Sequence, residues 1–284
     1  MRDILKYTLL PLFLFQACSD EIKKEKFDID WIYSDEGRMV GASYNTAWIN
    51  DNTMYLMDMR KPKEERTLLK MNPSLSMKMV PVVDSEKISK SILSAVGRTD
   101  TSMYIEWPSS FNSTGNHGIY FFEEDIYMLD VPNESYRRVT NTKSEEKAAR
   151  FSPDGKKISF ARDNDMYIYD IRTQKEKRIT FSGSETNLNG TVSWVYWEEI
   201  FGRKDLGYWW SDDSKAIAFL NTDESEVTKM HYVHWKPAES ELITQRYPKA
   251  GTKNPVVKLG IIELTSSKLK WVDLDPFEYL CRVK

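Results

Sequence analysis

Histidine, cysteine and blocks of basic residues are scarce in this chain of 284 residues. His231 and His234 lie close together but have no third ligand nearby, so the sequence indicates no metal site and no cofactor. Cys18 and Cys281 suggest no disulfide framework, and we expect Cys281 to be a small buried hydrophobic residue. Lys and Arg (40) nearly balance Asp and Glu (43) without forming a basic block, so nothing points to nucleic acid as a partner.

A long hydrophobic run is also absent, and the short one near the start is typical of a targeting signal. Basic residues precede the apolar run 7–15, which is shorter than the roughly 20 residues of a membrane-spanning helix. Cys18 then follows, as in a bacterial lipoprotein signal whose cysteine is lipidated; an ordinary signal peptide with an incidental cysteine is the alternative. We expect a signal peptide over 1–18, a charged tether over 19–39, and an exported protein held in a bacterial envelope by its lipid alone.

The body of the chain has a β pattern that repeats. Phe151-Ser-Pro-Asp-Gly forms a turn before an alternating strand, and a similar pattern returns from Trp210. Arg138-Val-Thr returns as Arg178-Ile-Thr at an offset of 40 residues. A period of about 40 to 50 residues is typical of a β-propeller, whereas separate hairpins would not need to recur in phase. We therefore predict an all-β fold: an incomplete propeller of four-stranded blades over 40–284, with roughly four to five blades.

The repeat is interrupted by a segment that carries two adjacent glutamates. From the strand at 167–171 to the next comparable strand, 256–264, the spacing more than doubles. Within this interval Glu198 and Glu199 lie among the aromatic residues of 194–201. One interpretation is a receptor for a cation or an amine, and the other is a surface turn beside a buried aromatic cluster. Binding groups often lie on loops of a rigid scaffold, so a short helical excursion from a blade favours the first interpretation.

An ordered series of motifs over roughly residues 150 to 265 resembles the dipeptidyl peptidase IV family, within the prolyl oligopeptidase class of serine peptidases. The resemblance is weak before residue 110 and absent from the signal. The motifs are, in chain order, Phe151-Ser-Pro-Asp-Gly, Asp165-Met-Tyr-Ile, Arg178-Ile-Thr, Gly190, Trp194-Val-Tyr, Glu198-Glu199, Phe201-Gly, Trp210-Ser, Ile217-Ala-Phe, Asp223, Ser225-Glu-Val, Tyr247-Pro-Lys-Ala-Gly and Asn254-Pro.

This resemblance implies an N-terminal β-propeller joined to a C-terminal α/β-hydrolase domain. In the family, paired glutamates grip the free α-amine of a peptide that is cut after a Pro or Ala in second position, and the matching residues here are Glu198 and Glu199. The family often has a third acid where this chain has Trp197. His117 aligns near a substrate-anchoring Arg of the family, as a weak substrate contact or, alternatively, as an ordinary loop residue. The resemblance also implies a homodimer of the full-length form.

The catalytic part of such an enzyme is missing from the sequence. No Gly-x-Ser-x-Gly motif occurs, and no strand-helix alternation follows residue 265. We therefore expect a fragment of a longer peptidase, or a truncated product, that contains no catalytic residue and needs an α/β-hydrolase domain as its partner. The alternative is a non-catalytic propeller lipoprotein that binds peptides or a partner protein. Because an incomplete propeller leaves edge strands uncovered, we expect the chain alone to be marginally stable.

Overall fold

The computed structural model describes residues 28–49, 52–99, 102–236, 238–274 and 279–283. The chain divides into two compact units, residues 1–41 and 42–284. The described part of the first unit forms two short helices, α1 (Ile29–Tyr33) and α2 (Asp35–Gly41), which bury no residue. The sequence interpretation as a tether did not anticipate these helices. Cys18 and the expected signal peptide lie outside the described residues, and no described helix is long and apolar enough to cross a membrane.

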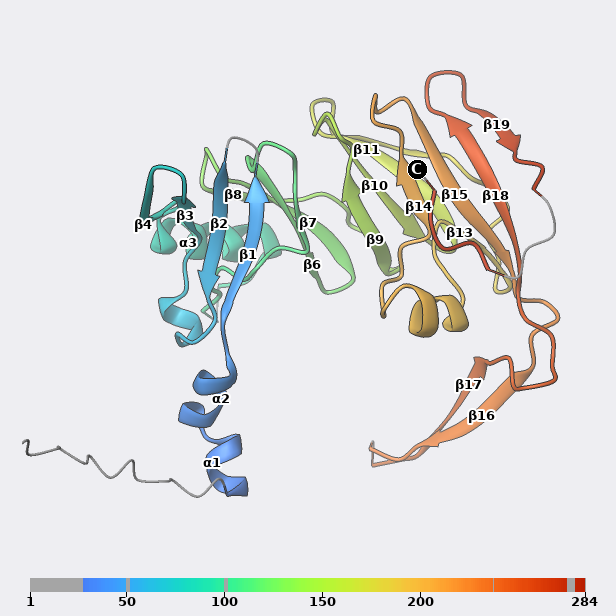
Figure 1. Cartoon of the computed structure of the whole chain (residues 1–284), viewed down its shortest axis with the longest axis horizontal. Coiled ribbons are helices and arrows are strands. Elements are labelled where there is room, and N and C mark those ends of the chain that lie inside the picture. The colour runs from blue at the N-terminus through green and yellow to red at the C-terminus, as the bar shows by residue number, and fades with distance from the viewer. Residues whose placement is uncertain (1–27, 50–51, 100–101, 237, 275–278, 284) are drawn as a thin grey trace, which may run out of the picture. The chain divides into compact units, whose positions relative to one another are not determined.

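Four antiparallel sheets follow one another along the second unit (Figure 1), and three of them have four strands in simple up-and-down order. The first consists of β1 (Tyr44–Ile49), β2 (Thr53–Asp58), β3 (Leu69–Asn72) and β4 (Ser76–Pro81), with the short helix η1 (Lys63–Glu65) between β2 and β3. The second consists of β5 (Ser110–Phe111), β6 (His117–Phe122), β7 (Asp125–Asp130) and β8 (Ser135–Arg138). The third consists of β9 (Glu146–Phe151), β10 (Lys157–Arg162), β11 (Asp165–Asp170) and β12 (Lys175–Arg178). A single longer helix, α3 (Ser85–Val96), connects the first two sheets and packs against β8.

The fourth sheet is more elaborate than the others. Its main path is β13-β15-β18-β19, and β14 pairs with β15 off this path. Its strands are β13 (Asn187–Asn189), β14 (Tyr208–Trp210), β15 (Ala216–Asp223), β18 (Val256–Glu263) and β19 (Lys268–Trp271). A separate hairpin of β16 (Lys229–His234) and β17 (Glu241–Arg246) is inserted between β15 and β18. The two long insertions in this sheet explain why the sequence repeat loses its spacing here.

Two hairpins show why the repeat has a fixed register. Strands β6 and β7 pair until Phe122 faces Asp125, which leaves Glu123 and Glu124 as a two-residue turn. Both residues have positive φ, 47° and 71°. Forty residues later, β10 and β11 are joined by Asp163 and Asn164, with φ of 50° and 61°. Positive φ at both positions matches the right-handed twist of the flanking strands, so each turn fixes the pairing of its strands.

A polar network repeats in the second and third sheets with the same offset. In the second sheet the Arg138 guanidinium donates to the Asp125 carboxylate, and its Nε also donates to the Thr140 carbonyl at 3.0 Å. The Thr140 hydroxyl accepts from the Ile126 amide at 2.8 Å. The third sheet makes the same bonds 40 residues later with Asp165, Met166, Arg178 and Thr180. The recurring Arg-x-Thr motif in the sequence therefore ties the last strand of a sheet to the strand before it.

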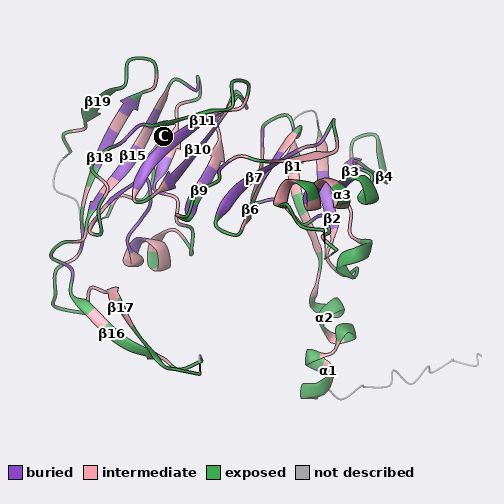
Figure 2. Cartoon of the chain, turned by 180° about the vertical axis from the view of Figure 1, so that it is seen from behind, coloured by how far each residue is buried: buried purple, intermediate pink, exposed green. Residues whose placement is uncertain are grey.

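The hydrophobic core lies between neighbouring sheets, where the buried strands stack (Figure 2). Ile126 of the second sheet packs in one cluster with Ile158 and Phe160 of the third, and all three are fully buried. Met166 of the third sheet packs with Ile217 of the fourth. Sheets that pack face to face in sequence order are the blades of a propeller. Among the described strands none pairs the first sheet with the fourth, so the prediction of an incomplete, all-β propeller is confirmed, with four blades.

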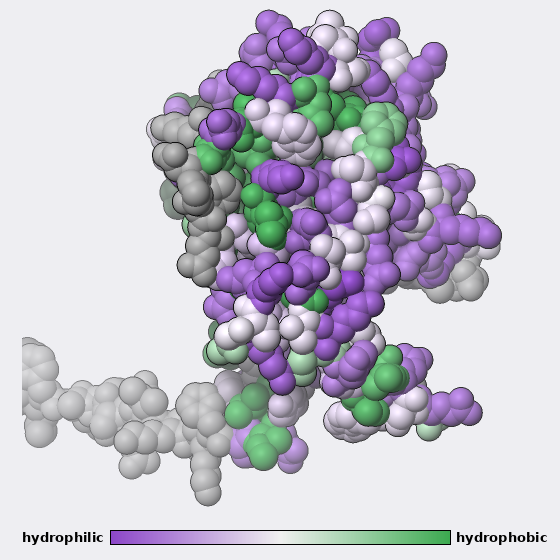
Figure 3. All heavy atoms as spheres, turned by 90° about the vertical axis from the view of Figure 1, so that its right-hand side faces the viewer, coloured by the Kyte–Doolittle hydropathy of each residue, from purple (hydrophilic) through white to green (hydrophobic). Residues whose placement is uncertain are grey.

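The surface over the last blade is mainly hydrophilic, with hydrophobic side chains between the polar ones (Figure 3). Val256, Leu269 and Trp271 are among the exposed apolar residues of this sheet. Cys281 is also exposed, so the prediction that it is buried is wrong. In the described segment 279–283, Leu280 and Val283 make the apolar contacts, and these leave the cysteine side chain to solvent.

Candidate functional site

The excursion, residues 190–207 between β13 and β14, is bound to the fourth sheet at both of its ends. The Gly207 amide donates to the Gly190 carbonyl at 2.9 Å, which closes the base of the excursion. The Val192 amide donates to the Asp205 carboxylate at 3.0 Å, two residues further in. Gly190 has φ of +76°, and a Cβ there would lie 2.7 Å from the Met166 sulfur. The sequence therefore needs glycine at the point where the chain leaves the sheet.

The middle of the excursion is a short π-helix, η2 (Tyr196–Ile200). The Trp197 amide donates to the Ser193 carbonyl, and the Phe201 amide donates to the Tyr196 carbonyl at 2.8 Å, a bond that spans five residues. Gly202, with φ of +57°, follows the last turn. Single π turns are rare and occur frequently at functional sites, because they displace side chains from the positions of a regular helix.

Aromatic residues anchor this helix to the blade. Tyr196 is 1% exposed and packs with Leu220 and Leu259, and its hydroxyl accepts from the Leu280 amide at 3.1 Å. The Trp194 ring lies 4.5 Å from the Tyr247 ring, between centroids. The aromatic cluster of the second sequence interpretation is thus present, and it supports the helix that carries the glutamates. The first interpretation, a receptor for a cation or an amine, stays a prediction.

The two glutamates differ in their surroundings. Glu198 accepts from the Arg203 guanidinium through both oxygens, at 3.0 Å from Nε and 2.8 Å from Nη2. This bidentate pairing lowers the pKa of Glu198 below its ordinary value, so the side chain is ionised at neutral pH. Glu199 is exposed and has no hydrogen-bond or ion-pair partner among the described residues. The helix therefore presents one carboxylate already paired with a cation and, next to it, one that is free.

A hollow of about 480 Å³ adjoins the helix on the side of Trp194 and Trp197. Its lining includes Asp205, Glu224 and Arg246. Burial raises the pKa of Asp205, and it raises the pKa of Glu224 to about 7, helped by the neighbouring Asp205 charge and opposed by Arg246. Glu224 lies in the turn directly after β15, and it is half-buried.

Two residues at this site escaped sequence reasoning. Arg203 pairs with Glu198 from five positions further along the chain, and Asp205 closes the excursion. Charged residues in a polar segment give no signal of their partners, because the π-helix geometry that brings them together depends on the aromatic anchors. Only the unusual density of charge between Phe201 and Leu206 could have drawn attention to them.

His117 lies elsewhere on the propeller. It is the first residue of β6, at the other end of the strand from the Glu123–Glu124 turn. Its Nδ1 lies 3.3 Å from the Asn112 amide nitrogen and its Nε2 lies 4.0 Å from an Asp130 oxygen. Burial lowers the pKa of His117, which favours the neutral ring. Another hollow is lined by Asp205 and by residues 121–124, which form the end of β6 and the turn that follows it. His117, at the opposite end of β6, does not line this hollow. The structure thus does not bring His117 to the glutamate pair.

The other candidates for chemistry also have ordinary surroundings. His231 lies on β16 with its Nδ1 2.8 Å from the Thr244 hydroxyl, on the exposed hairpin. His234 is at the end of the same strand. In the part of the chain that the structure describes, no group of three His, Cys, Asp or Glu side chains is arranged to hold a metal ion.

Comparison with known proteins identifies the family. The profile of the Dipeptidyl peptidase IV (DPP IV) N-terminal region matches residues 110–284. A probable dipeptidyl-aminopeptidase B of Phaeosphaeria nodorum is 34% identical over 182 residues, which are 60% of this chain and 19% of that protein. Dipeptidyl peptidase 4 of Trichophyton rubrum is 29% identical over 264 residues, covering 90% of this chain and 30% of that protein.

The fold also matches a solved structure. The crystal structure of Porphyromonas gingivalis dipeptidyl peptidase 4 superposes with a TM-score of 0.68 at 23% identity, over 89% of this chain and 36% of that one. The chain thus spans between about a fifth and about a third of the lengths of these relatives. Since the family profile extends over more than half of the sequence, the chain belongs to the dipeptidyl peptidase IV family and carries its N-terminal region.

Proposed function

We propose that this chain binds the free N-terminal amine of peptides through Glu198 and Glu199. The observation that carries the proposal is the π-helix itself, which presents two adjacent carboxylates from a rigidly anchored excursion. An ammonium group has three donors, and two carboxylates offer several acceptor positions for them. Glutamate side chains are long enough to converge on one nitrogen from neighbouring positions of a helix, although successive residues diverge by about 100°.

The Arg203 guanidinium supports this assignment because it shows that Glu198 already accepts a cation in this geometry. Glu199 supplies the second acceptor without having to break a contact first. A peptide amine would then share Glu198 with Arg203 or displace the guanidinium, whose side chain is 70% exposed and can return to water. Charge-assisted bonds of this kind are stronger than neutral ones.

Within a longer protein of this family, such binding would serve proteolysis by a serine-type dipeptidyl peptidase. A fixed distance between the amine and a nucleophile selects the second peptide bond by position and needs no new chemistry. We propose Xaa-Pro and Xaa-Ala peptides as ligands, an α/β-hydrolase domain as the source of the nucleophile, and an exported, lipid-anchored location. These assignments rest on the family and on the sequence signals at residues 1–18.

Isothermal titration calorimetry of the whole chain with the dipeptide Ala-Pro tests the proposal. We expect Ala-Pro to bind and N-acetyl-Ala-Pro to bind at least tenfold more weakly, because acetylation removes the charge of the amine. The double variant Glu198→Gln, Glu199→Gln should lose the same preference.

A matched control is available in the chain. Glu64 and Glu65 are also adjacent glutamates on a short helix, η1, and both are exposed. Replacing both with Gln should leave Ala-Pro binding unchanged. Equal binding of the free and acetylated dipeptides, or full binding by the Glu198→Gln, Glu199→Gln variant, would show that the pair does not recognise the amine.

A further inference from the structure

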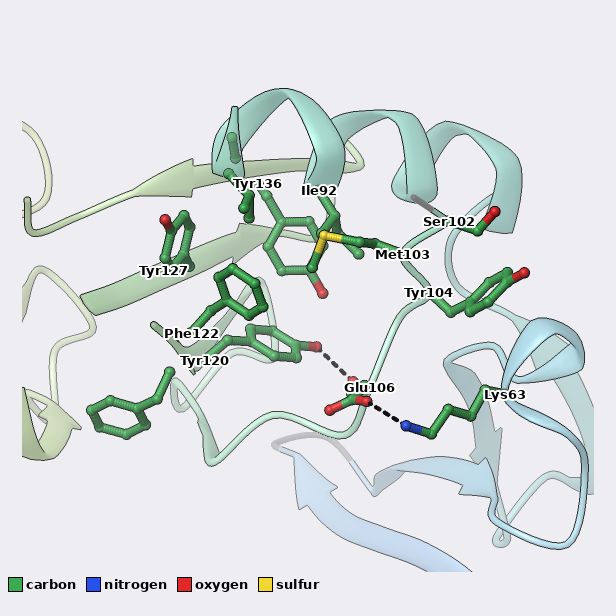
Figure 4. A pocket seen from close by; sticks show the side chains of 13 residues that line it. Lys63, Ile92, Ser102, Met103, Tyr104, Glu106, Tyr120, Phe122, Tyr127 and Tyr136 are labelled. Carbon is green, nitrogen blue, oxygen red and sulfur yellow. Dashed lines mark hydrogen bonds and ion pairs between the residues drawn. The ribbon is translucent and has the colours of Figure 1, made fainter. Parts of the chain in front are cut away.

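Two hollows of this chain differ in whether their charged groups already have partners. One lies on the second blade, between α3 and the strands β6 to β8 (Figure 4), and has a volume of about 380 Å³. The charged residues that line it, Lys63 and Glu106, pair with each other at 3.6 Å. The other is the hollow of about 480 Å³ beside η2, where two lining charges have no such partner. Of these two, the hollow beside η2 is the one that offers charge to a ligand.

Five charged residues line the hollow beside η2, and three of them are already paired. Lys147 pairs with Glu145 at 3.2 Å, and Arg246 pairs with Glu185 at 3.7 Å. The Arg246 guanidinium also donates to the backbone carbonyls of residues 224, 225 and 227, at 3.0, 3.3 and 3.0 Å. The cations in this wall are therefore already engaged by the chain itself.

The remaining two charges, Asp205 and Glu224, are carboxyl groups without an ion pair among the described residues. They come from different segments, the excursion and the turn after β15, and both are half-buried. Burial raises the pKa of both groups; Arg246 opposes the rise at Glu224, and the Asp205 charge adds to it. Two half-buried carboxylates that face one hollow are unfavourable without a cation, and a cationic ligand relieves this.

Two tryptophan rings of the excursion, Trp194 and Trp197, form part of the same wall. The Trp194 ring is held in place by the Tyr247 ring, with centroids 4.5 Å apart. The Arg203 guanidinium lies 6.0 Å from the centroid of the Trp197 ring, so this ring already has a guanidinium of the chain as a neighbour. Tryptophan faces attract cations, and arginine in particular. The aromatic wall and the carboxyl pair are separate features, and both favour a cation.

We propose that the hollow beside η2 binds the side chain of arginine at the first position of a peptide ligand. This rests on the proposed function, which places the amine of that residue at Glu198 and Glu199. Trp197 lines the hollow and directly precedes Glu198, so a long side chain on the first residue can enter the hollow beside the amine site. The planar guanidinium stacks on a tryptophan face while its N–H groups donate to Asp205 and Glu224, an arrangement that the compact ammonium of lysine reproduces less well.

Isothermal titration calorimetry of the whole chain with Arg-Pro and citrulline-Pro tests this assignment. Citrulline has nearly the shape of arginine but no charge, so the ratio of the two affinities isolates the charge of the side chain. We expect Arg-Pro to bind about tenfold more tightly at pH 7.5. At pH 5.5 this preference should fall severalfold, because the Glu224 carboxyl, with its pKa raised to about 7, is then protonated. Titration of the peptide amine affects both dipeptides alike and cancels in the ratio.

Three variants locate the preference in the hollow. Glu224→Gln should lower the ratio at pH 7.5 and remove most of its pH dependence. The double variant Asp205→Asn, Glu224→Gln should bring the ratio close to one, and its Asn side chain still has an oxygen to accept from the Val192 amide. Glu226→Gln is the matched control, because Glu226 lies in the same turn but is exposed and pairs with Lys253 at 2.7 Å. This control should leave the ratio unchanged.

The proposal is overturned if the unchanged chain binds neither dipeptide, if it binds both equally, or if the double variant keeps the full preference. A loss of preference in Glu226→Gln equal to that in Glu224→Gln would also overturn it. Circular dichroism shows whether each variant is folded, and if the double variant is not, Glu224→Gln and the pH dependence of the unchanged chain decide.

The failure of amine recognition would give a different result. Equal binding of free and acetylated Ala-Pro refutes the proposed function whatever the ratio of Arg-Pro to citrulline-Pro. If the proposed function holds, Glu198→Gln, Glu199→Gln should weaken Arg-Pro and citrulline-Pro by the same factor. A ratio of one in the unchanged chain refutes only the arginine site.

Discussion

The polar network around Asp165 makes a demanding test of how the third blade is held together. The Asp165 side chain is fully buried and accepts from four groups. The donors are the Arg178 guanidinium, the Thr180 hydroxyl, the Gly183 amide at 3.1 Å and the Asn189 amide nitrogen at 3.0 Å. Asp165→Ala removes the acceptor from all of them at once.

The free energy of unfolding that Asp165→Ala removes can be estimated from the partners that each donor still has in the variant. Arg178 is 42% exposed and can turn to water, and the Asn189 nitrogen keeps Asn164 and Ser182 as acceptors. The Thr180 hydroxyl, whose residue is buried, and the half-buried Gly183 amide lose their partner. At about 1 to 3 kcal/mol for each unpaired buried group, the free energy of unfolding should fall by about 3 kcal/mol.

The second blade supplies an internal comparison. There the Thr140 hydroxyl donates to Glu146 at 2.7 Å and not to the aspartate, so Asp125→Ala leaves it paired and should lower the free energy of unfolding by only about 1 to 2 kcal/mol. Asp170→Ala, at an exposed turn where the carboxylate accepts from Thr173, should lower it by about 1 kcal/mol or less.

Urea denaturation followed by tryptophan fluorescence measures the three free energies. The expected order of loss is Asp165→Ala, then Asp125→Ala, then Asp170→Ala. If the free energies of unfolding of Asp165→Ala and Asp170→Ala differ by less than about 1 kcal/mol, the buried network contributes little and the reasoning is refuted.

Four further substitutions should have measurable effects. Arg203→Ala should tighten Ala-Pro binding severalfold in calorimetry, because the Arg203 guanidinium no longer competes with the peptide amine for the Glu198 carboxylate. Unchanged or weaker binding would contradict this. Gly190→Ala, where a Cβ would meet a methionine sulfur at 2.7 Å, should lower the free energy of unfolding in urea by about 3 kcal/mol. Gly97→Ala, with φ of +77° but open space around it, should lower the free energy of unfolding by only about 1 kcal/mol. An equal loss for the two glycine variants would show that the contact with the methionine sulfur is irrelevant. Because the pKa of Glu224 is raised to about 7, its ionisation destabilises the fold as pH rises from about 4.5 through 7. Glu224→Gln should therefore be more stable than the unchanged chain by on the order of 1 to 2 kcal/mol at pH 8 but not at pH 4, and a pH-independent difference in thermal melts would contradict this.

The architecture could be predicted from the sequence because it depends on local and repeated signals. The 40-residue offset between Arg138 and Arg178 reports the blade period directly, and the structure shows that both arginines make equivalent bonds. The strand expected at 256–264 is found as β18 (Val256–Glu263). Turn residues and the alternation of apolar and polar residues along a strand depend on only a few neighbouring positions, so strands can be predicted from them without knowing the fold.

The parts that escaped prediction depend on contacts between distant segments. Helix α3 interrupts the β pattern and is stabilised by packing on β8, although its hydrophobic face is short. The partial burial of Glu224 results from the excursion and the hairpin meeting at one hollow. The glutamate pair was found from its neighbours in sequence, but the Arg203 contact depends on the π turn, which sequence spacing does not reveal.

The backbone bond between Gly190 and Gly207 has a consequence for how this fold can change. It closes the sheet beneath the excursion, so the strands on either side are already joined before residues 193–203 make any contact. The exposed residues among them could be exchanged while Tyr196 keeps its packing on Leu220 and Leu259 and the strands β13, β14 and β15 keep their pairing. Under the proposed function, ligand preference and blade stability are then largely separate properties, and substitutions of the exposed residues can change the first while the scaffold stays the same.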